Sequence, residues 1–517
     1  LMILQDRELM QEIIAAVKAE RMNVAYVVRR AFLAKAHYLE SLSSEVFRAR
    51  AADVRDVQER LLSRLLGRSG ASIANAPHGS IVVAREIAPS ETAALSPEGV
   101  VALVTQQGTL MSHVTILSRS RGVPAVIGVE QALERIPHGA PLLIDGERGQ
   151  VICWPDEADI RRHHTTRERE RRIGRLLSSR DRGPAATHDG RRVPVGANLE
   201  RPEDAAAARE SGAEGVGLFR TEFLFMNADS IPGEEAQWAA YQEVVRNYQD
   251  AMVTIRTLDL GGDKVPGLIG IAREENPFLG LRGIRFCLEH PELFLSQVRA
   301  LLRAAVGGNL RLLLPMVSGI GELRETRAII ARAADQLRDE GYPIPARVPV
   351  GVMIEVPSAV WMSDALAREA DYFSIGSNDL IQYCLAVDRG NAHVAHLYDA
   401  LDPAFLRALD LTVRNAHAAG IRVGSCGEMS GELPGLLLLV GLGVDELSVA
   451  PFLIARTKAI LAGVEVEELR GLAGRCLEAA AVEDVRRIVR EGLRVYPQFL
   501  CEEREGSLTC FWDPERD

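Results

Sequence analysis

The pattern of hydrophobic and polar residues changes several times along the chain. From residue 1 to about residue 67, apolar side chains recur every three to four positions, and Gly and Pro are almost absent. The residues that carry this spacing are Val54, Val57, Leu61 and Leu65. It is typical of helices with one apolar face, and it predicts a partial bundle of antiparallel helices over residues 1–67.

Residues 68–155 contain short apolar, β-branched runs such as "SIVVARE" and "APLLIDGE", separated by Gly and Pro. Such runs are typical of short strands and predict a compact α/β domain. The next segment includes "RRHHTTRERERRIGRLLSSRDRG", which is almost wholly charged, so we predict a solvated linker helix over residues 156–184. A basic binding patch is the alternative, although glutamates interleave with its arginines.

Between residues 185 and 499, eight apolar runs are each followed by a helical segment. They are "VPVGANL", "EGVGLFR", "VTIRTLDL", "LRLLLPMV", "VPVGVMIEV", "DYFSIGSNDL", "IRVGSCGE" and "DELSVAP". Eight such units predict a closed (β/α)₈ barrel, in which chemistry takes place at the C-terminal ends of the strands. We assign no role to the tail, residues 500–517.

Composition narrows the class of protein. The chain has 517 residues, of which 47% are apolar, and a formal net charge of −11. The apolar content predicts globular domains, and the negative charge argues against nucleic-acid binding. Seven cysteines are widely spread without a CxxC motif, which predicts reduced thiols and no disulfide framework. Since no 18-residue apolar run or signal peptide is present, we expect a soluble protein.

Charged residues end several of the predicted strands or begin the loops after them. They are Arg220, Arg256, Glu355, Asp379 and Arg389. Arginine forks bind phosphate and carboxylate oxygens, and carboxylates are the hard oxygen donors that Mg²⁺ takes. The set therefore predicts a site for a small, multiply charged anion and a metal ion. The alternative is that these residues form structural ion pairs around the barrel rim.

Two further residues are candidates for chemistry. Cys426 ends the seventh strand between Ser425 and Gly427, where a thiol could deliver a proton to a carbanion or enolate. His113 follows Ser112, a credible N-cap, at the predicted start of a helix. A neutral imidazole can attack phosphorus, and the helix N-terminus could hold the resulting phosphate. For either residue, the alternative is a structural role without chemistry.

His113 belongs to one predicted domain and the anion site to another. The charged linker helix between them suggests a swivelling domain, with hinge motion at segments such as "DRGPAA". The histidine would then collect a phosphoryl group at the barrel and carry it elsewhere.

Long motifs along the chain resemble a known family. "SHVTILSRSRGVPAVIG" resembles the phosphohistidine signature of phosphoenolpyruvate-utilising enzymes. "GVGLFRTEFLF", "IRTLDLGGDK", "EENPFLGLRGIR", "FSIGSNDLIQYCLAVDRGN" and "GSCGEMSG" are similar to successive motifs of Enzyme I of the phosphoenolpyruvate-dependent phosphotransferase system. The similarity runs from the first residues to about Val495.

The resemblance implies an activity and a role for each motif residue. Phosphoenolpyruvate would phosphorylate His113 at Nε2, and the phosphoryl group would pass to the phosphocarrier HPr docked on the helical domain. Cys426 would protonate the pyruvate enolate. The residues implied to bind phosphoenolpyruvate are Arg220, Arg256, Asn378, Asp379 and Arg389, and those implied to hold Mg²⁺ are Glu355 and Asp379. A cytoplasmic homodimer joined through the barrel is also implied.

The chain departs from the family pattern at three places. The family's opening segment is absent, so we expect an N-terminally truncated chain. Gly108, Thr109, Leu110 and Met111 stand where the sugar-system enzyme has Gly-Gly-Arg-Thr. This change points towards the nitrogen-regulatory relative, whose carrier is a homologue of HPr. The tail beyond residue 499 extends past the usual end.

Other functions remain open from the sequence. Pyruvate phosphate dikinase and phosphoenolpyruvate synthase share the histidine and barrel motifs, but they need a nucleotide-binding domain for which this chain has no glycine-rich phosphate loop. A catalytically inactive regulatory homologue is a second alternative. A lone barrel acting as a lyase on a keto acid is a third, and it would leave His113 idle.

Overall fold

The computed structural model divides the chain into two compact units, residues 1–167 and 168–517. It describes the following residues: 7–20, 22–41, 54, 58, 61–62, 65, 76–85, 87, 99–107, 123–146, 149–165, 167–168, 183–226, 231–261, 274, 276–389, 391, 393–496, 498–504 and 507–512. Val57, Met111, His113 and most of the predicted linker helix lie outside them.

The first unit begins with two helices, α1 (Arg7–Glu20) and α2 (Val24–Ser41). Their shared apolar cluster is formed by Ile13, Val27, Val28, Phe32 and Val54, all buried. Val54 is itself helical, as its spacing predicts. Of the four positions that predicted the helices, Val54 is buried in this cluster and Leu61 packs against it, whereas Leu65 is exposed and Val57 is not described.

A small sheet follows in the same unit. Its three parallel strands, in the order β1-β2-β3, are β1 (Ser80–Ala84), β2 (Val100–Thr105) and β3 (Ala125–Ile127). A short helix, α6 (Ala132–Arg135), precedes an antiparallel pair, β4 (Leu142–Asp145) and β5 (Gln150–Cys153). Residues of β2 contribute to two separate apolar clusters, so both faces of this strand are covered. The α/β expectation is confirmed here.

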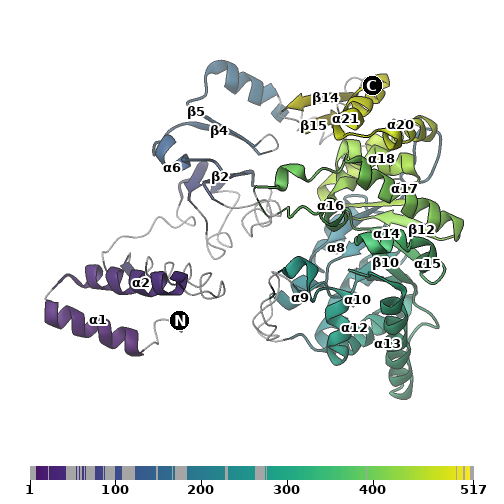
Figure 1. The fold of residues 1–517 in the computed structure, drawn as a ribbon, viewed down its shortest axis with the longest axis horizontal. Helices are drawn as coiled ribbons and strands as arrows, with labels where there is room; N and C mark the ends of the chain where they lie inside the picture. The colour runs from purple at the N-terminus through teal and green to yellow at the C-terminus, as the bar shows by residue number, and fades with distance from the viewer. Residues whose placement is uncertain are drawn as a thin grey trace. The chain divides into compact units, whose positions relative to one another are not determined.

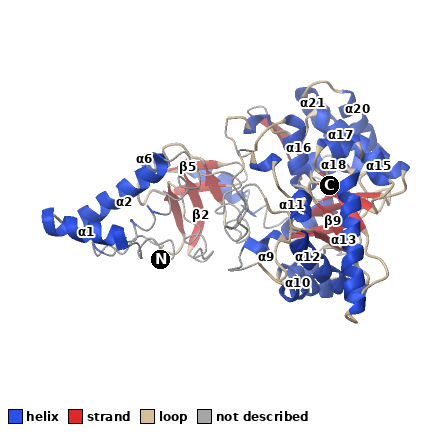
Figure 2. Ribbon diagram, turned by 60° about the horizontal axis from the view of Figure 1, so that its bottom comes forward, coloured by secondary structure: helices blue, strands red, loops and turns tan. Residues whose placement is uncertain are grey.

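The second unit contains a closed barrel of eight parallel strands (Figures 1 and 2). The strands are β6 (Val195–Leu199), β7 (Val216–Phe219), β8 (Val253–Arg256), β9 (Leu310–Leu314), β10 (Val350–Ile354), β11 (Tyr372–Ile375), β12 (Arg422–Ser425) and β13 (Glu446–Val449). Each strand pairs with the next, and β13 closes the ring on β6 through Leu447 and Val195. All eight lie within the runs that predicted them.

Helices surround this barrel (Figure 2). The α-helices are α8 (Asp204–Glu210), α9 (Glu222–Met226), α10 (Glu234–Asn247), α11 (Ile284–Glu289), α12 (Pro291–Ala304), α13 (Ile320–Asp339), α14 (Pro357–Trp361), α15 (Ser363–Ala367), α16 (Ser377–Leu385), α17 (Pro403–Ala418), α18 (Leu433–Leu442), α19 (Ile454–Ala462), α20 (Val466–Glu478) and α21 (Val482–Gly492). Short 3₁₀ turns are η4 (Pro277–Leu279), η5 (Ala305–Gly307), η6 (Ala395–Leu397), η7 (Glu428–Gly431), η8 (Pro451–Leu453) and η9 (Leu493–Val495). No described helix is long and apolar enough to cross a membrane.

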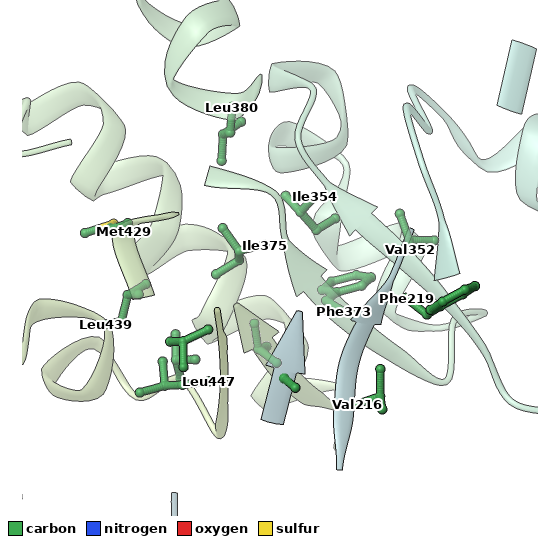
Figure 3. Close-up of a cluster of buried hydrophobic side chains, with 14 of the residues drawn as sticks. Val216, Phe219, Val352, Ile354, Phe373, Ile375, Leu380, Met429, Leu439 and Leu447 are labelled. Carbon is green, nitrogen blue, oxygen red and sulfur yellow. The ribbon is translucent and has the colours of Figure 1, made fainter. Parts of the chain in front are cut away.

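Strand side chains alternate between two environments. Those facing the helices, such as Val352, Ile354 and Phe373, are fully buried in the main core (Figure 3). A separate cluster lies on the other face of the strands and contains Leu218, Leu313, Met353, Tyr372 and Cys426. We call this second cluster the lumen cluster, because alternate residues of barrel strands fill the barrel interior. The barrel is thus a packed scaffold rather than a pore.

The last described elements form a hairpin of β14 (Phe499–Arg504) and β15 (Ser507–Trp512). Cys501 and Cys510 are cross-strand partners in it, with Cα atoms 4.1 Å apart, and they form a disulfide. The prediction of reduced thiols throughout is wrong for this pair. Spacing along the sequence gave no signal, because only the hairpin register places the two residues opposite each other. Cys153, Cys287, Cys384, Cys426 and Cys476 are free.

Candidate functional site

Most of the charged residues singled out in the sequence lie at or just after the C-terminal ends of the barrel strands, whereas Arg389 follows α16 (Ser377–Leu385) and reaches Asp379 from there. Arg220 directly follows β7, Arg256 is the last residue of β8, and Glu355 directly follows β10. Asn378 and Asp379 stand in the first turn of α16, immediately after β11. Because all eight strands are parallel in one closed ring, these ends share one rim, which we call the mouth.

Arginines and carboxylates alternate across the mouth in a continuous network. Arg256 donates to Glu222 (2.9 Å) and pairs with Asp259 (3.1 Å). Arg282 pairs with Asp259 (3.0 Å) and, on its other side, with Asp379 (2.8 Å). The network ends where Asp379 meets Arg389 at 3.4 Å.

Arg220 stands apart from this network. Its side chain is about one-third exposed and pairs with Glu200 at 2.9 Å. In contrast, Arg256 is buried, so a ligand would meet guanidinium groups at two depths. The predicted set of arginines is therefore gathered at the mouth, although each one also has a carboxylate partner.

Two buried nitrogen atoms of the network still lack hydrogen-bond partners among the described residues. They are Nε of Arg256 and one terminal guanidinium nitrogen of Arg389. A buried N–H without an acceptor is costly, and it is satisfied when an anion binds. The mouth therefore has donors available for the oxygens of an acidic ligand.

Glu355 is almost fully buried, and its Oε1 atom accepts a hydrogen bond from the backbone N–H of Met316 (2.6 Å). Burial, together with the negative charges of Asp379 and Asp259, raises the pKa of Glu355 to about 8. For Asp379, burial acts in the same direction, but Arg282 and Arg389 outweigh it and lower the pKa. The mouth thus holds four buried carboxyl groups, Glu222, Asp259, Glu355 and Asp379, against the three arginines of the network, and Glu355 is largely protonated at neutral pH.

This imbalance makes the mouth suitable for a cation. Within the described residues, no group of three or more His, Cys, Asp or Glu side chains is arranged to hold a metal ion alone. Mg²⁺, however, commonly binds through one or two carboxylates plus waters and substrate oxygens. Gly376 allows the close packing here, since a Cβ atom on it would lie 2.7 Å from Glu355 Oε2. Glu355 and Asp379 therefore fit the requirements of a divalent cation.

Asn378 joins two loops of the mouth. Its side-chain oxygen accepts a hydrogen bond from the backbone N–H of Glu428 (3.0 Å), which follows β12. Its backbone oxygen accepts another from the Tyr398 hydroxyl (3.1 Å). Asn378 thereby fixes the loop after β11 against the loop that contains Cys426.

Cys426 directly follows β12 and is 3% exposed. Burial raises the pKa of its thiol, while a hydrogen bond from Ser374 and the charge of Arg256 oppose this shift. The thiol is therefore protonated at neutral pH, as a proton donor must be. It belongs to the lumen cluster, so it approaches the mouth from inside the barrel.

Three residues of the network, Asp259, Arg282 and Glu222, were not assigned a role from the sequence, and the last two were not named at all. Arg282 lies in the quoted motif "EENPFLGLRGIR", 26 positions beyond the end of β8, so strand position alone gave no signal. Glu222 lies in "RTEFLF", two positions after Arg220. The structure shows both as ion-pair partners of residues at the mouth.

Comparison with known proteins places this geometry in a family. Residues 176–466 match the model of the PEP-binding domain of PEP-utilising enzymes, and residues 76–149 match that of their mobile domain. The second match includes His113, and the first includes every site residue that we predicted on the barrel.

Curated relatives match nearly the whole chain. The phosphoenolpyruvate-protein phosphotransferase of Staphylococcus carnosus (strain TM300) is 38% identical over 95% of this chain and 86% of its own length. That of Staphylococcus aureus (strain MSSA476) is 37% identical with the same coverage. That of Priestia megaterium is 35% identical over 96% of this chain and 86% of its own length. The resemblance drawn from the motifs is confirmed: the chain belongs to the phosphoenolpyruvate-protein phosphotransferase family.

Proposed function

We propose that the chain transfers the phosphoryl group of phosphoenolpyruvate to His113 and then to a histidine of a phosphocarrier protein, releasing pyruvate. The observation that carries the proposal is the network of arginines and carboxylates at the barrel mouth, with unpaired N–H donors. In phosphoenolpyruvate a carboxylate and a phosphate are attached to the same carbon. Arg220, Arg256 and Arg389, together with Asn378, supply the donors that such a compact anion requires.

Glu355 and Asp379 are the residues that we assign to Mg²⁺. When bound there, the ion would draw negative charge away from the phosphoryl oxygens. The excess of buried carboxylates and the raised pKa of Glu355 support this assignment.

Cys426 has the role of proton donor in this proposal. After the phosphoryl group leaves, the enolate of pyruvate must gain a proton on carbon. The buried, protonated thiol at the end of β12 is a group of the right type for this step.

The partner is a phosphocarrier, either HPr or its nitrogen-branch homologue, and we expect docking on the helical segment, residues 1–67. A cytoplasmic homodimer joined through the barrel completes the proposal. The four residues before the Ser112–His113 pair, Gly108 to Met111, differ from those of the sugar-system enzyme, and this difference favours the nitrogen branch.

The direct test is to incubate the purified chain with ³²P-labelled phosphoenolpyruvate and Mg²⁺, with a metal-chelated sample as control. We expect label on the protein that is lost in acid and stable in base, located in the peptide that spans residues 108–122, with one pyruvate per phosphate. Pyruvate without label on the protein would contradict the proposal and favour a barrel that acts alone. If neither labelled protein nor pyruvate forms, the chain is an inactive homologue.

We predict that Mg²⁺ stabilises the chain more at pH 8.5 than at pH 6, and that Glu355→Gln removes most of this difference. The pKa of Glu355 in the folded chain is about 8, above its ordinary 4.5, so the folded state binds this proton more tightly than the unfolded state. Its contribution to the free energy of unfolding is complete below pH 4.5 and is lost as the pH rises through 8. Mg²⁺ competes with the same proton and therefore binds better at high pH.

The measurement is a set of thermal melts at both pH values, with and without Mg²⁺. Glutamine keeps an oxygen for the N–H of Met316, so the variant retains that hydrogen bond. An equal Mg²⁺-induced rise in Tm for wild type and variant at pH 8.5 would exclude Glu355 as a ligand.

A further inference from the structure

Ser374 is a polar residue inside the barrel that the proposed function leaves without a role. It lies on β11 two residues after Tyr372, a member of the lumen cluster, so both side chains face the barrel interior. The intervening Phe373 and the following Ile375 belong to the core that faces the helices. Ser374 is 4% exposed, so its hydroxyl needs a partner within the protein.

That partner is the thiol of Cys426. The Ser374 hydroxyl donates to Cys426 Sγ at 3.3 Å, and the thiol is 3.7 Å from the backbone oxygen of Ile375, to which it can donate its own proton. If the thiol loses this proton, the contact with Ile375 no longer has a hydrogen. The hydrogen bond from Ser374 then becomes charge-assisted and stronger.

We propose that Ser374 is a positioning residue for proton delivery, holding the Cys426 sulfur while its proton passes to the enolate of pyruvate. The inference rests on the function proposed above and deepens it. In this step the S–H bond breaks, a C–H bond forms at the methylene carbon of the enolate, and the S–H electron pair stays on sulfur. The thiolate keeps the hydrogen bond from Ser374 until water returns a proton.

The surroundings of the thiol explain why such a donor is needed. Burial disfavours the thiolate most, and the negative charge of Glu355 adds to this effect, whereas Arg256 and Arg220 favour the thiolate. On the lumen side, Arg311 stacks over the Tyr372 ring at 4.2 Å and pairs with Glu446, so its charge is already neutralised. The Ser374 hydroxyl is the neutral group that donates directly to the sulfur.

Packing alone does not account for a serine at this position. Alanine has nearly the same volume and would fit the lumen without burying a hydroxyl. Ser374→Ala therefore removes the hydrogen-bond donor while nearly keeping the volume of the side chain, and so distinguishes a role in hydrogen bonding from a role in packing. Ser363→Ala is the matched control, because Ser363 is also fully buried and hydrogen-bonded, to the backbone oxygen of Val360 and to Asn415, but lies on α15.

The experiment compares two rates in a single turnover with labelled phosphoenolpyruvate and Mg²⁺. These are the rate of label appearing on the protein and the rate of keto-pyruvate formation, read by a coupled dehydrogenase. For Ser374→Ala we expect an unchanged labelling rate, pyruvate formation slowed about tenfold, and a larger solvent deuterium isotope effect on that step. Ser374→Thr, which keeps the hydroxyl, should recover most of the rate.

Several outcomes would overturn the inference. In one, Ser374→Ala is folded by thermal melt and forms pyruvate as fast as wild type. In another, labelling and pyruvate formation fall together, as in a merely destabilised chain, or threonine fails to rescue a folded variant. Absence of label on the wild-type chain would instead overturn the proposed function itself.

Discussion

Replacing His113 by alanine is expected to abolish acid-labile labelling by phosphoenolpyruvate while leaving ligand binding to the barrel intact. The imidazole is the nucleophile in the proposed transfer, and alanine offers no atom that can carry a phosphoryl group. The residues that we assign to substrate all lie in the other unit, residues 168–517. Binding of phosphoenolpyruvate with Mg²⁺, measured by calorimetry, should therefore have the wild-type Kd.

His138→Ala is the matched control for this experiment. His138 belongs to the same unit as His113 and is exposed, and it should take no part in the transfer. We expect full labelling of this variant. Label that persists in His113→Ala would show that another residue is the acceptor, and loss of label in both variants would point to damage of the small α/β domain.

Replacing Arg256 by lysine is expected to lower kcat/KM for phosphoenolpyruvate by about 10² to 10³-fold. Arg256 is buried at the end of β8, where its two terminal guanidinium nitrogens pair with Glu222 and Asp259. Its Nε has no hydrogen-bond partner among the described residues and could donate to a ligand. Lysine keeps the charge, but a single ammonium group cannot reproduce the planar fork. Methionine would be a poorer test, because it would leave the buried carboxylate of Glu222 without its ion-pair partner and endanger folding.

Arg303→Lys provides the control for Arg256→Lys. Arg303 is also a buried arginine between two carboxylates, Glu234 and Glu235, but it lies on α12. Steady-state kinetics and thermal melts of both variants should show a lower Tm in each and a lower kcat/KM only for Arg256→Lys. A similar kcat/KM for the two variants would mean that Arg256 is a structural residue.

The barrel could be predicted from the sequence because its strands are buried on both faces. Continuous β-branched runs such as "VPVGVMIEV" therefore mark each strand, and the parallel ring then fixes which ends meet. Arg220, Arg256 and Glu355 could be placed at the mouth by that argument alone. Their partners could not, because an ion pair depends on loop paths that no periodicity encodes.

Arg282 and Ser374 illustrate this limit in different ways. Arg282 lies just before α11 and pairs with Asp259 and Asp379, so its distance in sequence from β8 hides its place in the network. Ser374 is a short polar residue within an apolar run. Its hydrogen bond to Cys426 could not be predicted from the run alone, because it depends on the pairing of β11 with β12. The disulfide likewise depends on the register of the final hairpin.

Closure of the barrel through β13 and β6 has a consequence for biosynthesis. The two paired strands are about 250 residues apart in the chain. At a translation rate of roughly 5–20 residues per second, the edge of β6 waits about 10–50 s for its last partner. An unpaired parallel edge can join another nascent chain in that interval. Residues 1–167 have left the ribosome before then, so the exposed edge belongs to the barrel unit. The yield of folded protein in a heterologous host should therefore depend on how well chaperones bind the unfinished barrel.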